Sequence, residues 1–430
     1  MEALIQHGGG ICYPFESQAG AIVIGDNVMQ MYLQFGHGMM AHTRELLSAW
    51  GGGAAILSPR DLTEVQLIKI AADIGKVGAE TLLDPQCFST QADHYRLTKH
   101  AYWSVVSQYP NEVYSGGVRT AEFLASLAAA SRSLNVSRHI LPTPIATAVT
   151  DDYFAACEAI LDEAPNHFGQ EPQLITIALP STSILDELQI ENLIERARSW
   201  QNIVGFYVVA ETPGAYLIDN PVWLANLLIL TSGLRLLGKS VLVGYSHHQM
   251  MCLAAAKVDA IAAGTWLNVR SFSPEKFFTP ADDEISRRAT WYYCPQALSE
   301  YKLPFLDIAL TAGVLDQMRP DPILGSNYAD VLFQGLPPSA VNWGEQDAFR
   351  HYLTCLRSQT RRIRQTSFQD AFDDNLSMLD QAETLVSTLR REGVYGGDRD
   401  FVSCFDVNRA ALTRFRAARG QQLQRRWSLI

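Results

Sequence analysis

The sequence predicts an α/β fold: a (β/α)8 barrel of the TIM type, followed by an irregular extension and a C-terminal helical segment. Two observations carry this prediction. Eight short apolar runs alternate with longer amphipathic segments between residues 31 and 263, and the runs are continuously apolar and often β-branched. Strands that are covered on both faces, as in a parallel barrel, read in this way. The chain has 430 residues, and a barrel takes about 250 residues as one unit.

The predicted helices and strands follow one another in order. The strands cover residues 31–35, 54–58, 80–84, 138–142, 173–179, 204–210, 240–245 and 259–263. A helix is expected over 61–77, where Asp61 and Glu64 have the spacing of a capping box, and another over 184–200. The most apolar long stretch, 221–244, is interrupted by glycines and basic residues. We therefore interpret it as a buried helix followed by a strand, not as a membrane span.

An open, doubly wound sheet is the competing fold. Such sheets bind dinucleotides through a GxGxxG stretch after the first strand. The corresponding stretch here, QFGHGMM, has its two glycines at a different spacing. We therefore favour the barrel.

Four parts are predicted along the chain. They are an N-terminal segment (1–28), the barrel (29–275), an irregular extension (276–345) and a helical region with an arginine-rich end (346–430). Prolines and glycines crowd the extension, which is typical of irregular structure. In the last part, apolar residues recur at helical spacing, and this pattern indicates packing rather than function.

The composition indicates a chain with a large core. Hydrophobic residues make up 47%, charged residues 18%, and the net charge is −11. These values exclude wholesale disorder and argue against a surface that binds nucleic acid throughout. The seven cysteines are scattered without a CxxC pair, so we expect reduced thiols in a cytoplasmic protein, not disulfides or a cysteine zinc site. We predict no signal peptide, membrane span, metal or cofactor.

Polar residues follow the predicted strands at the end where barrels hold their active sites. Asp84 and Glu211 are the candidate catalytic pair, because two carboxylates can supply the acid and the base or nucleophile of glycosyl chemistry. Alternatively, each carboxylate caps the next helix or pairs with Arg60 or Arg270. The ligand is expected to be a small molecule of the nucleoside or sugar class. Its expected contacts are His37, Arg60, Gln86, Tyr245, His247, Trp266, Asn268 and Arg270.

The stretch GTWLNVR after the last predicted strand offers three kinds of contact. Trp266 can stack on a base or sugar ring, or alternatively plug the top of the barrel. Asn268 offers an amide that both donates and accepts hydrogen bonds, and Arg270 can bind a phosphate or carboxylate with two parallel bonds. His37 lies between two glycines, which would let a ligand approach the backbone closely.

The pair His247-His248 sits at the end of a predicted strand, just before a helix. Adjacent residues point in different directions, so at most one is expected to face a pocket. The pair has neither HxH nor HxxxH spacing, which would favour a metal. We interpret it first as a helix start or as satisfied core histidines, with ligand contact and metal binding as the alternatives.

Residues 204–270, from GFYVVAE to SVLVGYSHHQMMCLAAAKVDAIAAGTWLNVR, resemble the final third of barrels of the tRNA-guanine transglycosylase type. That family has the same order of a glycine-bearing strand, a helix and a strand that runs into a turn, and Arg270 falls near the arginine of that turn. The resemblance implies a barrel that handles nucleobases. The family's nucleophilic aspartate is replaced by Ala263 or Gly264, and its DSGGFQ-type stretch and cysteine-rich zinc site are absent. No catalytic residue therefore carries over.

The C-terminal stretch NRAALTRFRAARGQQLQRRW holds six arginines and no acid. One interpretation is a solvated helix face. The other is an arm that binds phosphates or a partner, because every base is an arginine and aromatic residues are interleaved. The residues that we assign to a nucleic-acid or protein partner are Arg414, Arg416, Arg425 and Arg426.

Two functions are consistent with these features. The first is an enzyme that binds a nucleoside-, nucleobase- or sugar-like ligand and carries out glycosyl transfer or hydrolysis. The alternative is a catalytically inactive transglycosylase-like barrel that serves as a subunit of a nucleic-acid-modifying or defence assembly. The polar strand ends favour the first, whereas the missing nucleophile and the long C-terminal extension favour the second.

Overall fold

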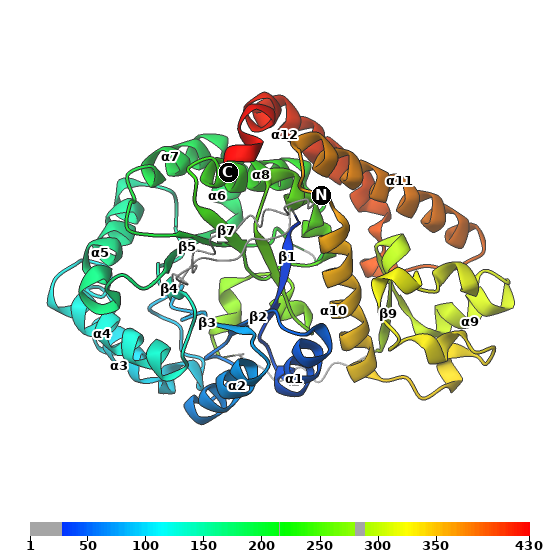
Figure 1. The fold of residues 1–430 in the computed structure, drawn as a ribbon, viewed down its shortest axis with the longest axis horizontal. Helices are drawn as coiled ribbons and strands as arrows, with labels where there is room; N and C mark the ends of the chain where they lie inside the picture. The colour runs from blue at the N-terminus through cyan, green and yellow to red at the C-terminus, as the bar shows by residue number, and fades with distance from the viewer. Residues whose placement is uncertain (1–27, 215, 280–288) are drawn as a thin grey trace, which may run out of the picture.

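The computed structural model describes residues 28–214, 216–279 and 289–430. It confirms the barrel, because eight parallel strands form one sheet in the order β3-β2-β1-β8-β7-β6-β5-β4 (Figure 1). All eight predicted runs overlap these strands. The strands are β1 Gln30–Gln34, β2 Ala54–Leu57, β3 Glu80–Leu83, β4 His139–Leu141, β5 Gln173–Leu179, β6 Gly205–Ala210, β7 Ser240–Val243 and β8 Ala260–Ala263.

The described strands leave one seam in the barrel, between β3 and β4, which no backbone ladder joins. The amide of Ser137 donates to the carbonyl of Thr81 across this seam, at 3.0 Å. The nearly buried guanidinium of Arg138 donates to Glu80 Oε2 at 2.9 Å and to the hydroxyl of Tyr32 at 2.8 Å. Arg138 therefore ties β4 to β3 and β1 at the amino-terminal end of the barrel.

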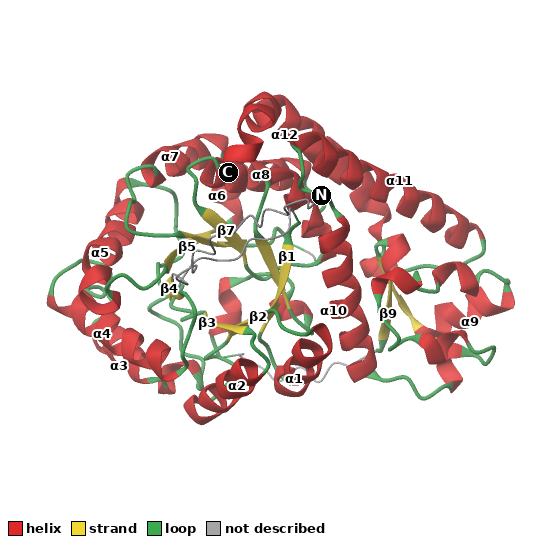
Figure 2. Ribbon diagram, viewed as in Figure 1, coloured by secondary structure: helices red, strands yellow, loops and turns green. Residues whose placement is uncertain are grey.

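Helices surround the sheet on its outer side (Figure 2). They are α1 Met39–Trp50, α2 Glu64–Lys76, α3 Ala101–Gln108, α4 Val118–Ser133, α5 Asp151–Phe168, α6 Ser181–Leu185, α7 Glu187–Ala197 and α8 Pro221–Arg235. A 3₁₀ helix over His248–Ala256 takes the place of an α-helix after β7.

The start of α2 corrects one detail of the sequence prediction. The capping box is formed by Thr63 and Gln66, not by Asp61 and Glu64, so the helix begins at Glu64. Asp61 instead accepts a hydrogen bond from Ser58 at 2.8 Å. Both Asp61/Glu64 and Thr63/Gln66 have the spacing of a capping box. Asp61 is held by its contact with Ser58, and Thr63 caps the helix.

Helix α8 is apolar on all sides, as a helix must be when it is covered on all sides. One face lies against the barrel, and α12 (Cys404–Arg426) crosses over the other (Figure 1). Asn220 caps α8 by accepting from two backbone amides of its first turn. In the described ranges, no helix is both long and apolar enough to cross a membrane.

The chain beyond the barrel forms a second lobe. The extension holds an antiparallel hairpin, and α10 stands between this hairpin and the barrel (Figure 1). The lobe's elements are β9 Trp291–Cys294, β10 Ser299–Lys302, α9 Leu303–Thr311, α10 Glu345–Arg362, α11 Phe368–Arg391 and α12. The predicted N-terminal segment, 1–28, lies outside the described residues apart from Val28. The six cysteines within the described ranges are free thiols and buried.

The Arg138 contact can be tested by substitution. Arg138→Met removes both hydrogen bonds of the guanidinium, so Tyr32 loses this partner and Glu80 keeps the hydrogen bond from Ser137 Oγ at 3.3 Å. We expect the free energy of unfolding to fall by about 2 kcal/mol, measured by urea denaturation. Arg132→Met is the matched control, because Arg132 is exposed where it pairs with Glu171 and donates to the carbonyl of His167, and such surface contacts contribute about 0–1 kcal/mol. Equal losses in the two variants would contradict the role given to Arg138.

Candidate functional site

The carboxyl group of Asp84 lies at the carboxyl end of β3 and is buried, with 1% of the residue exposed. Its Oδ2 accepts hydrogen bonds from the hydroxyls of Tyr245 at 2.8 Å and Tyr207 at 3.1 Å. Its Oδ1 accepts from the amide of Gln86 at 3.0 Å. Burial raises the pKa of Asp84 to about 6, although these three hydrogen bonds act in the opposite direction. An acid that titrates near neutral pH can both give and take a proton.

The side chain of Gln86 extends this network toward β2. Its Nε2 lies 3.1 Å from the hydroxyl of Tyr245, and its Oε1 accepts from the amide of Arg60 at 2.9 Å. The hydroxyl of Ser58 donates to Oε1 of Gln86 at 3.1 Å and accepts from Nε2 of Gln86 at 2.9 Å. Gln86 and Tyr245 both adopt positive φ angles, 58° and 52°. This backbone conformation is uncommon for side-chain-bearing residues and is concentrated at functional sites.

Three members of this network, Ser58, Tyr207 and Gln34, are absent from the predicted site residues. Tyr207 lies inside the apolar run of β6, where an aromatic residue reads as core. Gln34 ends β1, and its Oε1 lies 3.3 Å from the hydroxyl of Tyr207. The Nε2 of Gln34 is buried and has no partner among the described residues, so this part of the barrel interior offers a free donor.

A cover of aromatic rings packs against Tyr245, the tyrosine that holds Asp84. Phe88 packs against Phe272 and Phe277 with ring centroids 4.9 and 5.1 Å apart. Phe272 also packs against Tyr245 at 5.2 Å. All of these rings are buried, so a ligand reaches Asp84 only if part of this cover moves.

Glu211 does not join the Asp84 network. Its Oε2 accepts from the amide of Ser181, at 2.9 Å, at the start of α6. Its backbone forms an isolated bridge with Phe272, one of the rings of the cover. The structure therefore places Glu211 at the start of α6, a helix that precedes its own strand, and not at the start of the next helix, which was the alternative to catalysis.

The side chain of Arg60 lies beside the cover and does not contact Asp84. Its Nε donates to the carbonyl of Lys276 at 2.5 Å, and its Nη1 pairs with Asp61 at 3.2 Å. Because Phe277 follows Lys276, this hydrogen bond fixes the end of the cover to the loop after β2.

Both histidines of the pair are buried, at 2% and 1% exposure. Nδ1 of His247 accepts from the amide of Gln249 and starts the 3₁₀ helix, as the first interpretation has it. Burial lowers the pKa of His247 well below its ordinary value and that of His248 to about 3. Both rings pack against Tyr216. They therefore lie as neutral groups at the junction of the barrel and the second lobe.

Arg270 also lies at this junction. Its Nε donates to the carbonyl of Gly264 at 2.9 Å, and its Nη1 pairs with Glu300 of β10 at 3.3 Å. The guanidinium stacks on the ring of Tyr352 at 3.4 Å. Arg399 pairs with the other oxygen of Glu300 at 2.9 Å. The arginine expected to bind a ligand thus binds the second lobe of its own chain.

The other predicted contacts after β8 also face the second lobe. The ring of Trp266 packs against Phe349 of α10 at 4.8 Å, and its Nε1 donates to the carbonyl of His37 at 3.2 Å. The side chain of His37 is exposed. Asn268 lies in a short 3₁₀ turn, and its Oδ1 is buried without a partner in the described part of the chain.

The arginines of α12 fall into two groups. Arg414 pairs with Glu187 at 2.6 Å and Arg419 pairs with Glu191, both on α7. Arg416 lies over the ring of Phe372, at 5.0 Å. The second group does not pair with α7 and is exposed; it consists of Arg416, Arg425 and Arg426. Part of the predicted arm therefore holds α12 on the barrel, and part of it faces solvent.

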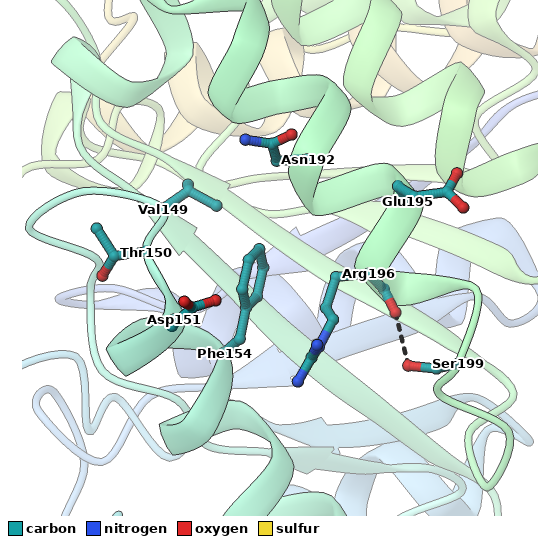
Figure 3. A pocket seen from close by; sticks show the side chains of 8 residues that line it. All are labelled: Val149, Thr150, Asp151, Phe154, Asn192, Glu195, Arg196 and Ser199. Atoms are coloured by element: carbon teal, nitrogen blue, oxygen red, sulfur yellow. Dashed lines mark hydrogen bonds between the residues drawn. The ribbon is translucent and has the colours of Figure 1, made fainter.

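A wide surface groove lies between α5 and α7, on the outside of the barrel (Figure 3). Asp151 and Phe154 of α5 line one side, and Glu195 and Arg196 of α7 line the other. Arg196 is already paired with Glu158 through two hydrogen bonds. Within the described residues, no cluster of three histidine, cysteine or acidic side chains could hold a metal ion.

Neither a protein-family model nor a curated protein sequence matches the chain. The barrel is similar to solved structures of low identity. One is 3-dehydroquinate dehydratase from Aquifex aeolicus, which is 10% identical with a TM-score of 0.33 over 58% of this chain and 95% of that chain. Another is thiamine phosphate pyrophosphorylase from Pyrococcus furiosus, 9% identical, with a TM-score of 0.29 over 58% and 94%. A third is deoxyribose phosphate aldolase from Aeropyrum pernix, 14% identical, with a TM-score of 0.30 over 55% and 92%. Likenesses at these TM-scores carry no argument about the activity of this chain.

The raised pKa of Asp84 makes a prediction about stability. A carboxyl whose pKa rises on folding, from 3.8 to about 6, costs stability once it ionises. This cost is absent below about pH 4, grows as pH rises, and is complete above about pH 6, at about 3 kcal/mol. We expect Asp84→Asn to remove it. The stability of this variant relative to wild type should therefore increase between about pH 4 and pH 7 in urea unfolding.

Asp186→Asn is the control of opposite sign. The side chain of Gln189 and the backbone amide of the same residue donate hydrogen bonds to Asp186, and these bonds lower the pKa of Asp186. The wild-type carboxylate therefore stabilises the fold above its unfolded pKa and loses this contribution as pH falls. A difference between Asp84→Asn and wild type that stays constant with pH would show that Asp84 titrates normally.

Proposed function

We propose that this chain is a barrel enzyme in which Asp84 carries out acid–base chemistry on a nucleoside-, nucleobase- or sugar-like ligand. The observation that carries the proposal is a buried carboxyl at the end of a barrel strand, held by two tyrosine hydroxyls, with a pKa near 6. Buried acids with pKa values near the working pH are concentrated at active sites. The network that holds Asp84 also contains two residues in strained backbone conformations.

In this proposal the reaction is glycosyl hydrolysis or transfer. The protonated carboxyl of Asp84 gives its proton to the leaving group as the glycosidic bond breaks. A water or acceptor hydroxyl attacks the anomeric carbon, and Glu211 takes its proton. The free Nε2 of Gln34 donates a hydrogen bond to the ligand, and Gln86 and Tyr245 hold Asp84 in place. The ligand class rests on the polar strand ends and on the resemblance to transglycosylase-type barrels.

A second function is favoured by a different observation. The aromatic cover buries Asp84, and Glu211 is used to cap α6. A catalytically inactive barrel needs no access to Asp84 and could serve as a subunit of a nucleic-acid-modifying assembly. In that case the exposed Arg425 and Arg426 of α12 would bind phosphates.

Activity assays with two variants test the enzyme. The substrates are p-nitrophenyl ribofuranoside and guanosine, with release of p-nitrophenol or guanine as the measurement. We expect turnover to fall as pH rises through about 6, because the protonated form of Asp84 is required. Asp84→Asn should lower turnover by at least about 100-fold.

Glu211→Gln should lower turnover while leaving the melting temperature nearly unchanged, because glutamine keeps an oxygen that accepts from Ser181. Asn192→Ala, in the surface groove between α5 and α7, is the control and should keep full activity. Wild-type activity in Asp84→Asn would exclude the proposed role of Asp84. Absence of turnover in the wild type would favour the inactive barrel.

The arginines of α12 test the second function. Deletion of the helix is unsuitable, because Leu412, Phe415 and Leu423 are buried and the helix covers α8. We therefore choose Arg425→Ala/Arg426→Ala and measure binding of a fluorescein-labelled DNA duplex by anisotropy at several salt concentrations. If both arginines contact phosphates, the salt slope should become shallower by about 2.

The matched control is Arg414→Ala/Arg419→Ala, which removes two charges that are paired within the chain. This variant is expected to bind the duplex as the wild type does and to lose only about 0–1 kcal/mol of stability per pair. Salt-insensitive binding, or equal binding by both double variants, would contradict the phosphate-binding role.

A further inference from the structure

We propose that the cavity between the end of β8, the β9–β10 hairpin and α10 binds a small aromatic carboxylate. This cavity is separate from the Asp84 network, and the proposal made for it does not depend on the function proposed for Asp84. Its floor is made of buried polar groups, and its rim is made of aromatic rings. The residues that carry the argument are Thr265, Arg270, Trp291, Glu300, Phe349 and Arg399.

The floor of the cavity offers hydrogen-bond donors and little capacity to accept. Both oxygens of Glu300 are already used, one by Arg270 and one by Arg399. Nε of Arg399 is buried and has no partner in the described ranges. The ligand that these groups recognise is therefore an acceptor, and a carboxylate accepts most strongly from guanidinium groups.

Thr265 is an independent sign of a missing partner. The residue is 2% exposed, it lines the cavity, and its Oγ1 forms no hydrogen bond with any described residue. A buried hydroxyl without a partner costs about 1–3 kcal/mol. A ligand oxygen in the cavity would satisfy Thr265 and Arg399 together.

The rim of the cavity suits a flat ring. Trp266, Trp291 and Phe349 are half-buried, whereas Thr265, Arg270 and Glu300 of the floor are buried and the Arg399 side chain is 17% exposed. Trp291 carries the guanidinium of Arg399 over its face at 4.2 Å, and Trp266 and Phe349 meet edge to face. Aromatic rings favour stacked or edge-to-face partners, so a ring held here continues an existing arrangement.

The size of the cavity sets the orientation of the ligand. Its volume of about 50 Å³ is room for three to five waters at ~10–15 Å³ each. A carboxylate group fits this space, whereas a whole ring does not. The carboxylate therefore lies on the floor and the ring lies between the aromatic residues of the rim. Glu345, in the first turn of α10, is the other carboxylate of the lining, and it disfavours ligands with further negative charge.

The test uses the full-length protein and 4-fluorobenzoate, with ¹⁹F NMR titration as the measurement. We expect saturable binding of 4-fluorobenzoate and at least about tenfold weaker binding of the neutral isostere 4-fluorobenzamide. Thr265→Val removes only the hydroxyl and should weaken binding of 4-fluorobenzoate by about tenfold.

Thr354→Val is the matched control. Thr354 of α10 is also a buried threonine whose hydroxyl lacks a partner in the described part of the chain, but it does not line this cavity. Its substitution should leave the affinity unchanged, and so should Asp84→Asn. No binding of 4-fluorobenzoate, equal binding of the benzamide, or equal affinities in Thr265→Val and Thr354→Val would overturn the proposal. Loss of binding in Asp84→Asn would place the ligand in the barrel and would also overturn it.

Discussion

The buried guanidinium of Arg270 is the contact on which the arrangement of the two lobes depends. A charge that is 3% exposed must be paired, and its partners come from four places: the end of β8, Tyr216 in the loop after β6, Glu300 in the hairpin, and Tyr352 on α10. Two residues later the chain reaches Phe272, whose amide donates to Thr212 Oγ1 at 3.2 Å. The loop that satisfies Arg270 therefore also places a ring over Asp84.

Near the carboxyl ends of the strands, the interior of the barrel departs from an apolar core. Gln34, Asp84 and Tyr207 come from different strands and meet near the carboxyl ends, where the Tyr207 hydroxyl has both a carboxylate and an amide oxygen within reach. It carries a single proton, so it can donate to only one of them at a time. A buried carboxyl that is held this way costs stability instead of adding to it. Departures of this kind from local folding rules are expected at functional sites.

The sequence predicted the barrel because strand runs and helical spacing are local signals. It could not predict the partners of the polar residues, because these partners are distant in the chain. Arg270 and Glu300 come from separate parts of the fold, and Tyr207 looks like any core aromatic in an apolar run. The interpretation of His247 as a helix start agrees with the structure, since that role depends only on neighbours in the chain, whereas its expected contact with a ligand stays a prediction. Asp84 was singled out by its position after a strand, but its tyrosine partners were found only in three dimensions.

Access to Asp84 is limited by how the cover is fastened. The loop after β3 and the loop after β8 are joined to each other, since the amide of His94 donates to the carbonyl of Phe277 at 3.1 Å and the amide of Thr279 donates to Asp93 at 2.6 Å. Arg60 fixes the same segment through the carbonyl of Lys276. The two loops therefore move together or not at all. Breaking the contact of Arg60 costs less than breaking the fully buried Arg270 pair, because Arg60 is 19% exposed and water can replace its partner. A ligand that binds at Asp84 would thus displace the cover on the side of β2 and β3, away from the second lobe.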